Sequence, residues 1–423
     1  MEPVIVHLKH HLRLHDNPAL FKACQTSDAV IPVFIVTDKM GSASKAWLYH
    51  SLQSFQASLK SIGLTLILRR GEEKKIIADL KKEAKTTTVF TNEPNLLFEL
   101  GSIRTKEGRP YQVFTPFWKA THLLPIEKPL GTPSKGAHTP KMTSLSLEEL
   151  HLQPLPSWDR DFWKTWEPGE KGAKKRLTHF LNGPISHYSV NRDFPFLEDG
   201  VSHLSPHLHF GEISIREIFH QVKKYPSFNR QLFWREFAHH LLYHFPHTID
   251  QPLREEFSKF PWSYNKKRLK AWQEGKTGYP IVDAGMRELW QTGWMHNRVR
   301  MIVASFLIKD LLIHWKEGAD WFMDTLVDAD LANNTFGWQW VAGSGADAAP
   351  YFRIFNPTLQ GKKFDPEGLY VKKYCPELAS LPPKLVHTPW LSPNKLDYPA
   401  PIIDHILAKE KALTAFHAMA RKK

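Results

Sequence analysis

Residues 293–315 have the sequence GWMHNRVRMIVASFLIKDLLIHW, and residues 328–357 have the sequence DADLANNTFGWQWVAGSGADAAPYFRIFNP. In the first stretch, apolar side chains recur at i, i+3 and i+4, which is typical of an amphipathic helix with one buried face. The same spacing is found in four segments that precede it, at 171–183, 214–225, 229–245 and 279–293. We therefore expect the chain beyond about residue 168 to form an all-α domain.

The first 115 residues follow a different pattern, in which short apolar and β-branched runs alternate with amphipathic stretches. The runs expected to be strands are 4–8, 28–36, 64–68, 86–92 and 110–114. The stretches expected to be helices are 17–25, 43–62, 72–83 and 94–105. This alternation predicts an α/β domain, a doubly wound parallel sheet of the Rossmann-like kind with helices on both faces. No GxGxxG follows the first run, so the sheet alone names no ligand.

A proline-rich stretch without periodicity lies between these two patterns. Residues 125–156 contain six prolines, with Gly, Ser, Thr and Lys between them. That composition is typical of a long inter-domain connection. We therefore predict three parts: an α/β domain at 1–124, a linker at 125–167 and an all-α domain at 168–423.

Charge and composition narrow the class of protein. The chain of 423 residues has 56 Lys and Arg against 43 Asp and Glu, a net charge of +13, which favours an anionic partner such as nucleic acid. No apolar run approaches the ~18 residues of a membrane span, and the N-terminus is too polar for a signal peptide, so we expect a cytoplasmic protein. Two cysteines provide neither a disulfide framework nor a Cys-based zinc site. The 15 tryptophans are more than core packing requires.

Asp328 and Asp330 lie two residues apart in an Asn- and Gly-rich segment that we do not expect to be a regular helix. A hard metal ion would need more oxygen ligands than the segment offers, and no metal site is expected here. One carboxylate could instead pair with Arg300 while the other binds the N–H groups of a heteroaromatic ring. A pair of helix-capping acids is the remaining alternative. His240, His244 and His247 are spaced to share a helix face, but without an acid in register they do not predict a metal site either.

Longer strings identify the chain as similar to a known family. It resembles the photolyase/cryptochrome flavoproteins over nearly its whole length, most closely the bacterial class I cyclobutane pyrimidine dimer photolyases. The strings that carry the resemblance are LRLHDNPAL (12–20), FTPFWK (114–119), PGEKGA (168–173), LSPHLHFGEIS (204–214), FWREF (233–237), AWQEGKTGYPIVDAGMR (271–287), TGWMHNR (292–298), WQW (338–340) and DAAPYFRIFNPTLQGKKFDPEG (347–368). The resemblance implies an antenna chromophore on the α/β domain and a bent FAD enclosed by the all-α domain.

The resemblance also implies a set of FAD contacts, with Asn334 nearest the redox-active nitrogen. These contacts are Tyr188, Val201, Ser202, His203, Leu204, Ser205, Phe228, Arg300, Asp328, Ala329, Asp330 and Asn334. Hydroxyls and backbone N–H groups at a helix start suit the pyrophosphate, although Val201 stands where the family usually has Thr. Arg300 paired with Asp328 beside the ring would favour an anionic reduced flavin. Phe228 stands where the family usually has Trp.

Three tryptophans match the family's chain of electron carriers between the protein surface and the flavin. They are Trp262, Trp315 and Trp338. Each alone would be read as core packing, but the three matched positions together favour electron transfer. A buried flavin cannot meet a reductant directly, so short hops between indoles would bring charge inward.

The positions that match the family's lesion contacts are Arg192, Gln231, Trp234, Asn297, Arg298, Met301 and Trp340. Trp234 and Trp340 would clamp a flipped-out pyrimidine pair by stacking. Asn297 and Met301 are four residues apart and would share one helix face. Arg192 and Arg298 would hold phosphates, the alternative being solvated surface charges.

Gln231 departs from the dimer photolyases, which have Glu at this position. We take Gln231 and Asn334 as catalytic candidates and expect weaker repair, because an amide donates a hydrogen bond but has no proton to share. Gln is usual in (6-4) photolyases and several cryptochromes. The (6-4) photolyases also carry a second His after the one that matches His296, whereas this chain has Asn297 there, and Asn297-Arg298 is the dimer-repair pattern. Repair of cyclobutane dimers is the favoured function, and repair of (6-4) products or a cryptochrome-type photoreceptor are the alternatives.

The antenna chromophore is less well indicated. Asn92 and Glu93 resemble the pair that binds a reduced folate, which favours 5,10-methenyltetrahydrofolate, but the segment 40–46 offers no matching partner and an empty site is the alternative. His11 replaces an Asp of the family's opening motif. The expected partner is damaged DNA rather than a membrane, and we expect a monomer that associates with the nucleoid when bound to DNA.

Overall fold

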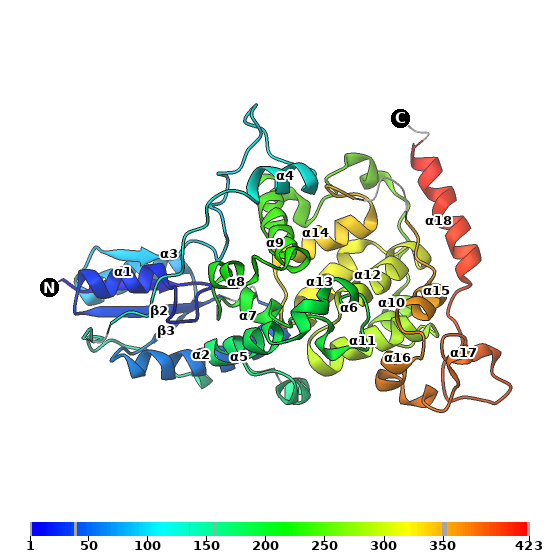
Figure 1. Ribbon diagram of the computed structural model, residues 1–423, viewed down its shortest axis with the longest axis horizontal. Coiled ribbons are helices and arrows are strands. Elements are labelled where there is room, and N and C mark those ends of the chain that lie inside the picture. The colour runs from blue at the N-terminus through cyan, green and yellow to red at the C-terminus, as the bar shows by residue number, and fades with distance from the viewer. Residues whose placement is uncertain (1, 38–39, 135, 155–156, 349–352, 421–423) are drawn as a thin grey trace. The chain divides into compact units, whose positions relative to one another are not determined.

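The computed structural model describes residues 2–37, 40–134, 136–154, 157–348 and 353–420 (Figure 1). The segment 349–352 of the DAAPYFRIFNP string therefore lies outside the described residues, as do parts of the predicted linker. The chain folds into two compact units that interleave in sequence. The first unit comprises 1–99, 124–186 and 202–232, and the second comprises 100–123, 187–201 and 233–423. The prediction instead divided the chain into three continuous parts, with borders after residues 124 and 167. Those domain borders stay a prediction.

The first unit contains a parallel sheet of four strands in the order β3-β2-β1-β4. The strands are β1 (Val4–Leu8), β2 (Val30–Val36), β3 (Ile67–Arg70) and β4 (Val89–Thr91). Every residue of β1 and β2 is buried, which explains why these strands are continuous apolar runs rather than alternating ones. The predicted parallel α/β sheet is confirmed.

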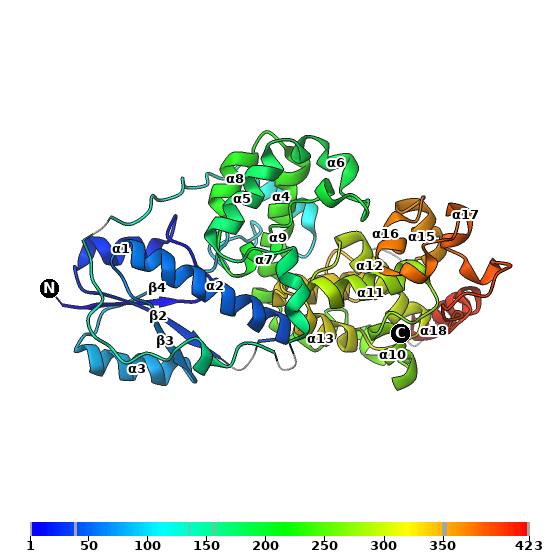
Figure 2. The same cartoon turned by 90° about the horizontal axis from the view of Figure 1, so that it is seen from below.

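Helices cover both faces of this sheet. Helices α1 (Pro18–Thr26) and α2 (Ser42–Ser61) lie on one face and α3 (Glu73–Ala84) lies on the other, as Figure 2 shows. This placement follows from the strand order, because the chain crosses back over β1 between β3 and β4 and right-handed crossovers then require the opposite face. The first unit also contains α5 (Glu170–Leu181), α7 (Ser205–His209) and α8 (Ile215–Val222).

The predicted helix at 94–105 is wrong, since no described residue there is helical. The side chain of Asn95 donates to the backbone carbonyls of Leu208 at 3.4 Å and Ile213 at 3.0 Å, which fixes the chain in an irregular path. Gly101 has a φ of +83°, a conformation that a helix cannot contain.

The predicted strand at 110–114 is also wrong. These residues are irregular up to Val113, and α4 (Phe114–Thr121) begins where the strand was expected to end. Phe114 and Phe117 are both buried and lie three residues apart, so the apolar pattern here has helical and not strand periodicity.

The proline-rich stretch is irregular as predicted but is hydrogen-bonded to the first unit along its length. Val30 N donates to His138 O at 2.9 Å, His138 N donates to Asp28 O at 2.7 Å, and Leu145 N donates to Leu68 O at 3.0 Å. These residues extend the backbone pairing next to β2 and β3. The stretch therefore belongs to the first unit and is not a free tether.

Buried polar groups hold α7 and α8 to the N-terminal motif LRLHD. Arg13, which is fully buried, donates to the carbonyl of Gly211 at 2.8 Å, and Asp16 pairs with Arg216 at 2.5 Å. Glu212 is also fully buried and accepts from the indole N–H of Trp47 at 2.9 Å. Paired in this way, the buried charges have satisfied hydrogen bonds, as burial requires.

The second unit is helical. Its helices are α4, α6 (Tyr188–Asn191), α10 (Lys266–Gln273), α11 (Pro280–Thr292), α12 (Asn297–Ser305), α13 (Trp315–Thr325), α14 (Leu331–Ala342), α15 (Pro357–Phe364), α16 (Leu369–Tyr374), α17 (Pro383–Val386) and α18 (His405–Ala420). Helix α9 (Pro226–His244) has residues in each unit. The core is built where α11 packs against α12, α15 and α16, and where α13 packs against α14.

The helix predicted within residues 293–315 is interrupted. Helix α12 ends at Ser305 and a π-helical turn follows at 306–310. Lys309 and Asp310 in this turn are both buried, and Asp310 pairs with His405 at 2.5 Å. In the described ranges, none of the helices combines the length and the apolar character needed to cross a membrane.

Candidate functional site

Arg300 and Asp328 form the ion pair that the sequence predicted. Nη2 of Arg300 donates to both carboxylate oxygens of Asp328, at 3.0 and 2.8 Å, and the side chain of Asp328 is only 4% exposed. Nε of Arg300 donates to Met295 O at 2.7 Å, which fixes the guanidinium against the loop that precedes α12. The pair therefore ties α12 to the segment that leads into α14.

Asp330 is a helix cap. Its carboxylate accepts from the backbone N–H of Asn333 at 2.8 Å and so begins α14. Nε2 of His239 lies 3.4 Å from its other oxygen. The expectation that this segment is not a regular helix is wrong beyond Asp330, because the cap offsets the weak helix propensity of the Asn and Gly residues that follow.

Asn334 and Trp338 lie one turn apart on α14 and face α13. The amide of Asn334 donates to Ala319 O at 3.0 Å. Trp338 is buried, with its ring edge-on to Phe322 at 5.0 Å and to Trp272 at 6.3 Å. Trp272 is completely buried. The sequence analysis did not single it out as a neighbour of Trp338.

The other two predicted electron carriers share a histidine neighbour. His314 lies 5.4 Å from Trp315 and 5.1 Å from Trp262 by ring centroids. Trp315 is buried at the first position of α13, whereas Trp262 is half-buried. The order of burial, from Trp338 and Trp315 to Trp262, agrees with a path that ends at the surface, but electron transfer itself stays a prediction.

Arg298 and Arg192 meet at one carboxylate. Arg298 pairs with Asp193 at 2.8 Å and its guanidinium lies 4.4 Å above the ring of Phe364, while Arg192 lies 4.0 Å from the same carboxylate. The side chains of both arginines are partly buried. Neither arginine is therefore a solvated surface charge, which was the alternative to a phosphate contact. Tyr188, beneath Arg192 at 5.4 Å, is buried, and burial raises the pKa of its hydroxyl.

Asn297 and Met301 are one turn apart on α12 as expected. Asn297 is exposed and Met301 is half-buried, with its sulfur 4.0 Å from Nη1 of Arg298. Trp340, on α14, is half-buried and packs against the core of the second unit. Ala329 is buried and Val201 is half-buried. The structure thus places these residues without testing their roles.

Trp234 is part of an aromatic cluster that the sequence did not predict. Its ring stacks on Phe114 with centroids 3.5 Å apart and an angle of 9°, and it lies 5.8 Å from Phe336. Phe237 packs edge-on against Trp234 at 6.1 Å. One face of the predicted base-stacking platform is therefore already covered by Phe114.

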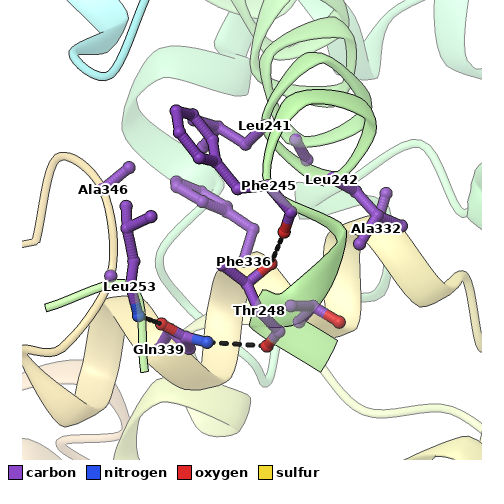
Figure 3. Close-up of a pocket in the computed structure, with 12 residues that line it drawn as sticks. Leu241, Leu242, Phe245, Thr248, Leu253, Ala332, Phe336, Gln339 and Ala346 are labelled. Atoms are coloured by element: carbon purple, nitrogen blue, oxygen red, sulfur yellow. Dashed lines mark hydrogen bonds between the residues drawn. The ribbon is translucent and has the colours of Figure 1, made fainter. Parts of the chain in front are cut away.

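Phe336 also borders a nearly filled space between α9 and α14 (Figure 3). This space has a volume of only about 20 Å³. Gln339 closes it by donating to Thr248 O at 2.7 Å and accepting from Leu253 N at 3.0 Å. This side of α14 is packed and has no room for a base.

Gln231 lies one turn before Trp234 on α9. Its side-chain N–H donates to Ser227 O at 3.1 Å within the same helix. One of the two N–H donors of the side chain that the sequence assigned to a lesion carbonyl is therefore engaged with the helix backbone. Phe228, which is buried, packs against Phe180 at 4.7 Å.

The predicted pyrophosphate contacts of the first unit precede and begin α7. Ser202 accepts from Leu204 N at 3.4 Å, His203 has a φ of +53°, and Ser205 is exposed at the helix start. Leu204 is buried and anchors the loop. These positions are consistent with an ordered turn, and flavin contact by them stays a prediction.

The predicted folate residue Asn92 is used inside the first unit. It is buried, accepts from Ala19 N at 2.9 Å and donates to Asn17 at 2.8 Å. Glu93 is exposed, and its carbonyl oxygen lies 2.7 Å from Nε2 of His11. His11, which stands where the family has Asp, is thus in hydrogen-bond contact with the segment that follows β4.

Glu288 was missed by the sequence analysis. This fully buried carboxyl group accepts from Tyr370 at 2.6 Å and from His296 N at 3.2 Å, and burial raises its pKa to about 7. Because His296 caps α12, Glu288 orients the turn that leads to Arg300. Glu288 lies on the buried, apolar face of α11. A charged residue at an apolar position of a helical pattern is the signal by which the sequence could have indicated it.

Replacing Gly318 with Ala should destabilise the protein. A Cβ at Gly318 would lie 2.0 Å from Cη2 of Trp338, which is too close for any side chain, so we expect a loss of about 1–3 kcal/mol in the free energy of unfolding. Gly337→Ala is the matched control, because nothing lies within 4 Å of its added Cβ and helix propensity should raise stability by up to about 1 kcal/mol. Urea unfolding followed by near-UV circular dichroism measures both, and equal effects would contradict the packing argument.

Glu288→Gln should remove a pH dependence of stability. The carboxyl group ionises near pH 4.5 when unfolded and near 7 when folded, so stability falls as pH rises through this window. Gln keeps the hydrogen bond from Tyr370 without the charge, and its gain relative to wild type should reach up to about 3 kcal/mol at pH 8.

Urea unfolding at pH 5 and pH 8 measures that gain. Glu410→Gln is the control, because Glu410 is an exposed residue of α18, and this change should have little effect at either pH. A constant difference between Glu288→Gln and wild type at both pH values would show that the carboxyl group is not protonated when folded.

Comparisons with known proteins agree with this arrangement. Residues 4–95 match the model of the DNA photolyase family, and residues 228–418 match the model of the FAD binding domain of DNA photolyase. The chain is 43% identical to a deoxyribodipyrimidine photo-lyase of Agrobacterium fabrum over 99% of its length and 98% of the relative. It is 33% identical to cryptochrome-1 of Arabidopsis thaliana over 98% of its length and 70% of that protein.

A solved structure gives the same result. The crystal structure of a class III photolyase from Agrobacterium tumefaciens has a TM-score of 0.95 and 42% identity, covering 99% of this chain and 98% of that one. The sequence strings indicated a class I photolyase, and this choice of class stays a prediction. The full-length matches and the two family models show that the chain belongs to the DNA photolyase family and contains its FAD-binding domain.

Proposed function

We propose that the protein is a light-driven deoxyribodipyrimidine photo-lyase that splits cyclobutane pyrimidine dimers in DNA. The observation that carries the proposal is the ion pair of Arg300 and Asp328 at the start of α14, the helix that also presents Asn334 and Trp338. When bound, reduced FAD supplies an electron to the lesion after absorbing light and recovers it once the ring has opened.

The donor set suits a flavin. An isoalloxazine ring offers N–H donors and carbonyl acceptors at its edge, which the carboxylate of Asp328 and the guanidinium of Arg300 complement. Asn334 supplies an amide that can accept or donate. For the phosphates, we propose Ser202 and Ser205 with the N–H groups at the start of α7; Tyr188, Val201, His203, Leu204, Phe228, Ala329 and Asp330 complete the proposed contacts.

The lesion contacts proposed here are side chains of the second unit. Phe114 supports one face of the Trp234 ring by stacking, so the opposite face is the one we propose for the flipped-out base. Arg298 and Arg192 converge on Asp193, and phosphates of the damaged strand would compete with that carboxylate for them. Asn297, Met301 and Trp340 complete the proposed lesion contacts.

Two observations favour second candidates. The identity with a plant cryptochrome supports a photoreceptor, in which light reduces the flavin through the tryptophans without repair. Gln231 supports repair of (6-4) products.

We propose that the enzyme is a monomer in the cytoplasm and that it lies at the nucleoid when it is bound to DNA. The proposed antenna is methenyltetrahydrofolate.

Repair under blue light by the anaerobically reduced protein tests the proposal. We expect an oligonucleotide with a cyclobutane thymine dimer to be repaired and one with a (6-4) product to remain unchanged, as measured by chromatography. Gln231→Glu should raise the quantum yield severalfold without altering dimer affinity, because the amide of Gln231 is engaged with Ser227 and has no proton to share. Repair of neither lesion by a flavin-loaded, photoreducible protein would favour the photoreceptor.

Trp338→Phe should block light-driven reduction of the oxidised flavin. Phenylalanine is far harder to oxidise than an indole, so the path to Trp315 and Trp262 is interrupted. Repair by chemically reduced enzyme should be retained, because that reaction does not use the path. Absorbance of the flavin during illumination measures the first effect, and loss of repair in the second assay would assign Trp338 to the repair reaction instead.

A further inference from the structure

A second cavity lies in the helical unit, and none of the residues that line it is a proposed flavin contact. It has a volume of about 780 Å³ and is lined by residues of α10, α11 and α13 and the turns beside α10 (Figure 1). Small-molecule sites in proteins typically occupy about 300–1,000 Å³. The cavity is therefore large enough to hold a ligand of nucleotide size.

Large aromatic side chains line this cavity and face solvent. Trp290 is 47% exposed and Tyr264 is 70% exposed, although large aromatic side chains usually bury most of their surface. The rings of Trp290 and Trp321 are stacked, at 5° and 6.0 Å between centroids, so Trp321 supports the exposed ring of Trp290 as a flat wall. Leu269 and Met286 add apolar surface. A planar heteroaromatic ring would stack on such a wall.

The charge around the cavity is strongly positive. Lys266, Lys270, Lys276 and Arg287 line it, against the single carboxylate of Glu274. Glu274 is already shared by Lys276 at 2.9 Å and Lys270 at 3.6 Å, and Arg287 pairs with Glu377 at 2.6 Å. In the described ranges no carboxylate lies within ion-pair distance of Lys266, whose ammonium lies 5.8 Å from the ring of Tyr264. The lysines therefore leave cationic charge available for an anion.

We propose that this cavity binds a free nucleoside phosphate, with its base stacked on Trp290 and its phosphates held by Lys266 and Lys270. An exposed indole beside ammonium groups that outnumber the carboxylates is the combination that a base joined to phosphates recognises. The volume of about 780 Å³ suits one nucleotide, whereas a strand of nucleic acid would need a groove that runs along several nucleotides. The inference does not rest on lesion repair, and the site shares none of the residues assigned to it.

Isothermal titration of the flavin-loaded, full-length protein with ATP tests the site. Trp290→Ala should weaken ATP binding by about tenfold or more, which is the effect of removing a base-stacking ring. Lys266→Ala should weaken it severalfold and reduce its salt dependence. Adenosine and tripolyphosphate, titrated separately, should each bind more weakly than ATP because each makes only part of the contact.

Matched controls distinguish this cavity from other sites. Trp390→Ala removes a tryptophan of similar exposure, 42%, outside the cavity, and Lys409→Ala removes an exposed lysine of α18; both should bind ATP as the wild type does. Absence of ATP binding, or binding that is equal in wild type, Trp290→Ala and Lys266→Ala, would overturn the proposal. Binding of an oligo(dT) strand, but not of ATP, with the same dependence on Trp290 would overturn the assignment to a free nucleotide.

Discussion

The ion pair of Arg300 and Asp328 is the interaction on which the helical unit depends. A carboxylate that is 4% exposed is costly to bury, and its two hydrogen bonds to one guanidinium nitrogen offset that cost only while the arginine is held in place. Met295 O holds it, and Glu288 in turn orients the cap of α12. A chain of buried polar contacts thus fixes the start of α14 relative to α11 and α12.

Close packing sets the second constraint. Trp338 can lie edge-on to Phe322 only because position 318 has no side chain, so the glycine in α13 is accepted despite its cost to a helix. In the cluster around Trp234, the ring of Phe114 stacks on the indole and covers one of its faces. In both places a neighbouring residue sets the space beside a ring for which function is proposed.

Much of the fold could be predicted from the sequence, because its signals are local. The buried runs of β1 and β2 and the helical spacing of α11 and α12 are properties of consecutive residues. The helix predicted at 94–105 failed because Asn95 bonds to carbonyls more than a hundred residues away, which no local pattern contains. The sequence pattern left open which carboxylate pairs with Arg300, and the resemblance indicated Asp328. The stacking of Phe114 on Trp234 was not predicted, because it joins distant segments.

The proline-rich stretch has the composition of a tether but not its behaviour. The backbone amide of His138 is hydrogen-bonded to Asp28, just before β2, and that of Leu145 to Leu68 of β3, so these bonds must open before a protease can bind the segment. Dissecting the chain at its prolines would therefore cut into a compact unit and expose the edge of β3. Composition marks where a chain has little regular structure, whereas the hydrogen bonds determine where it can be divided.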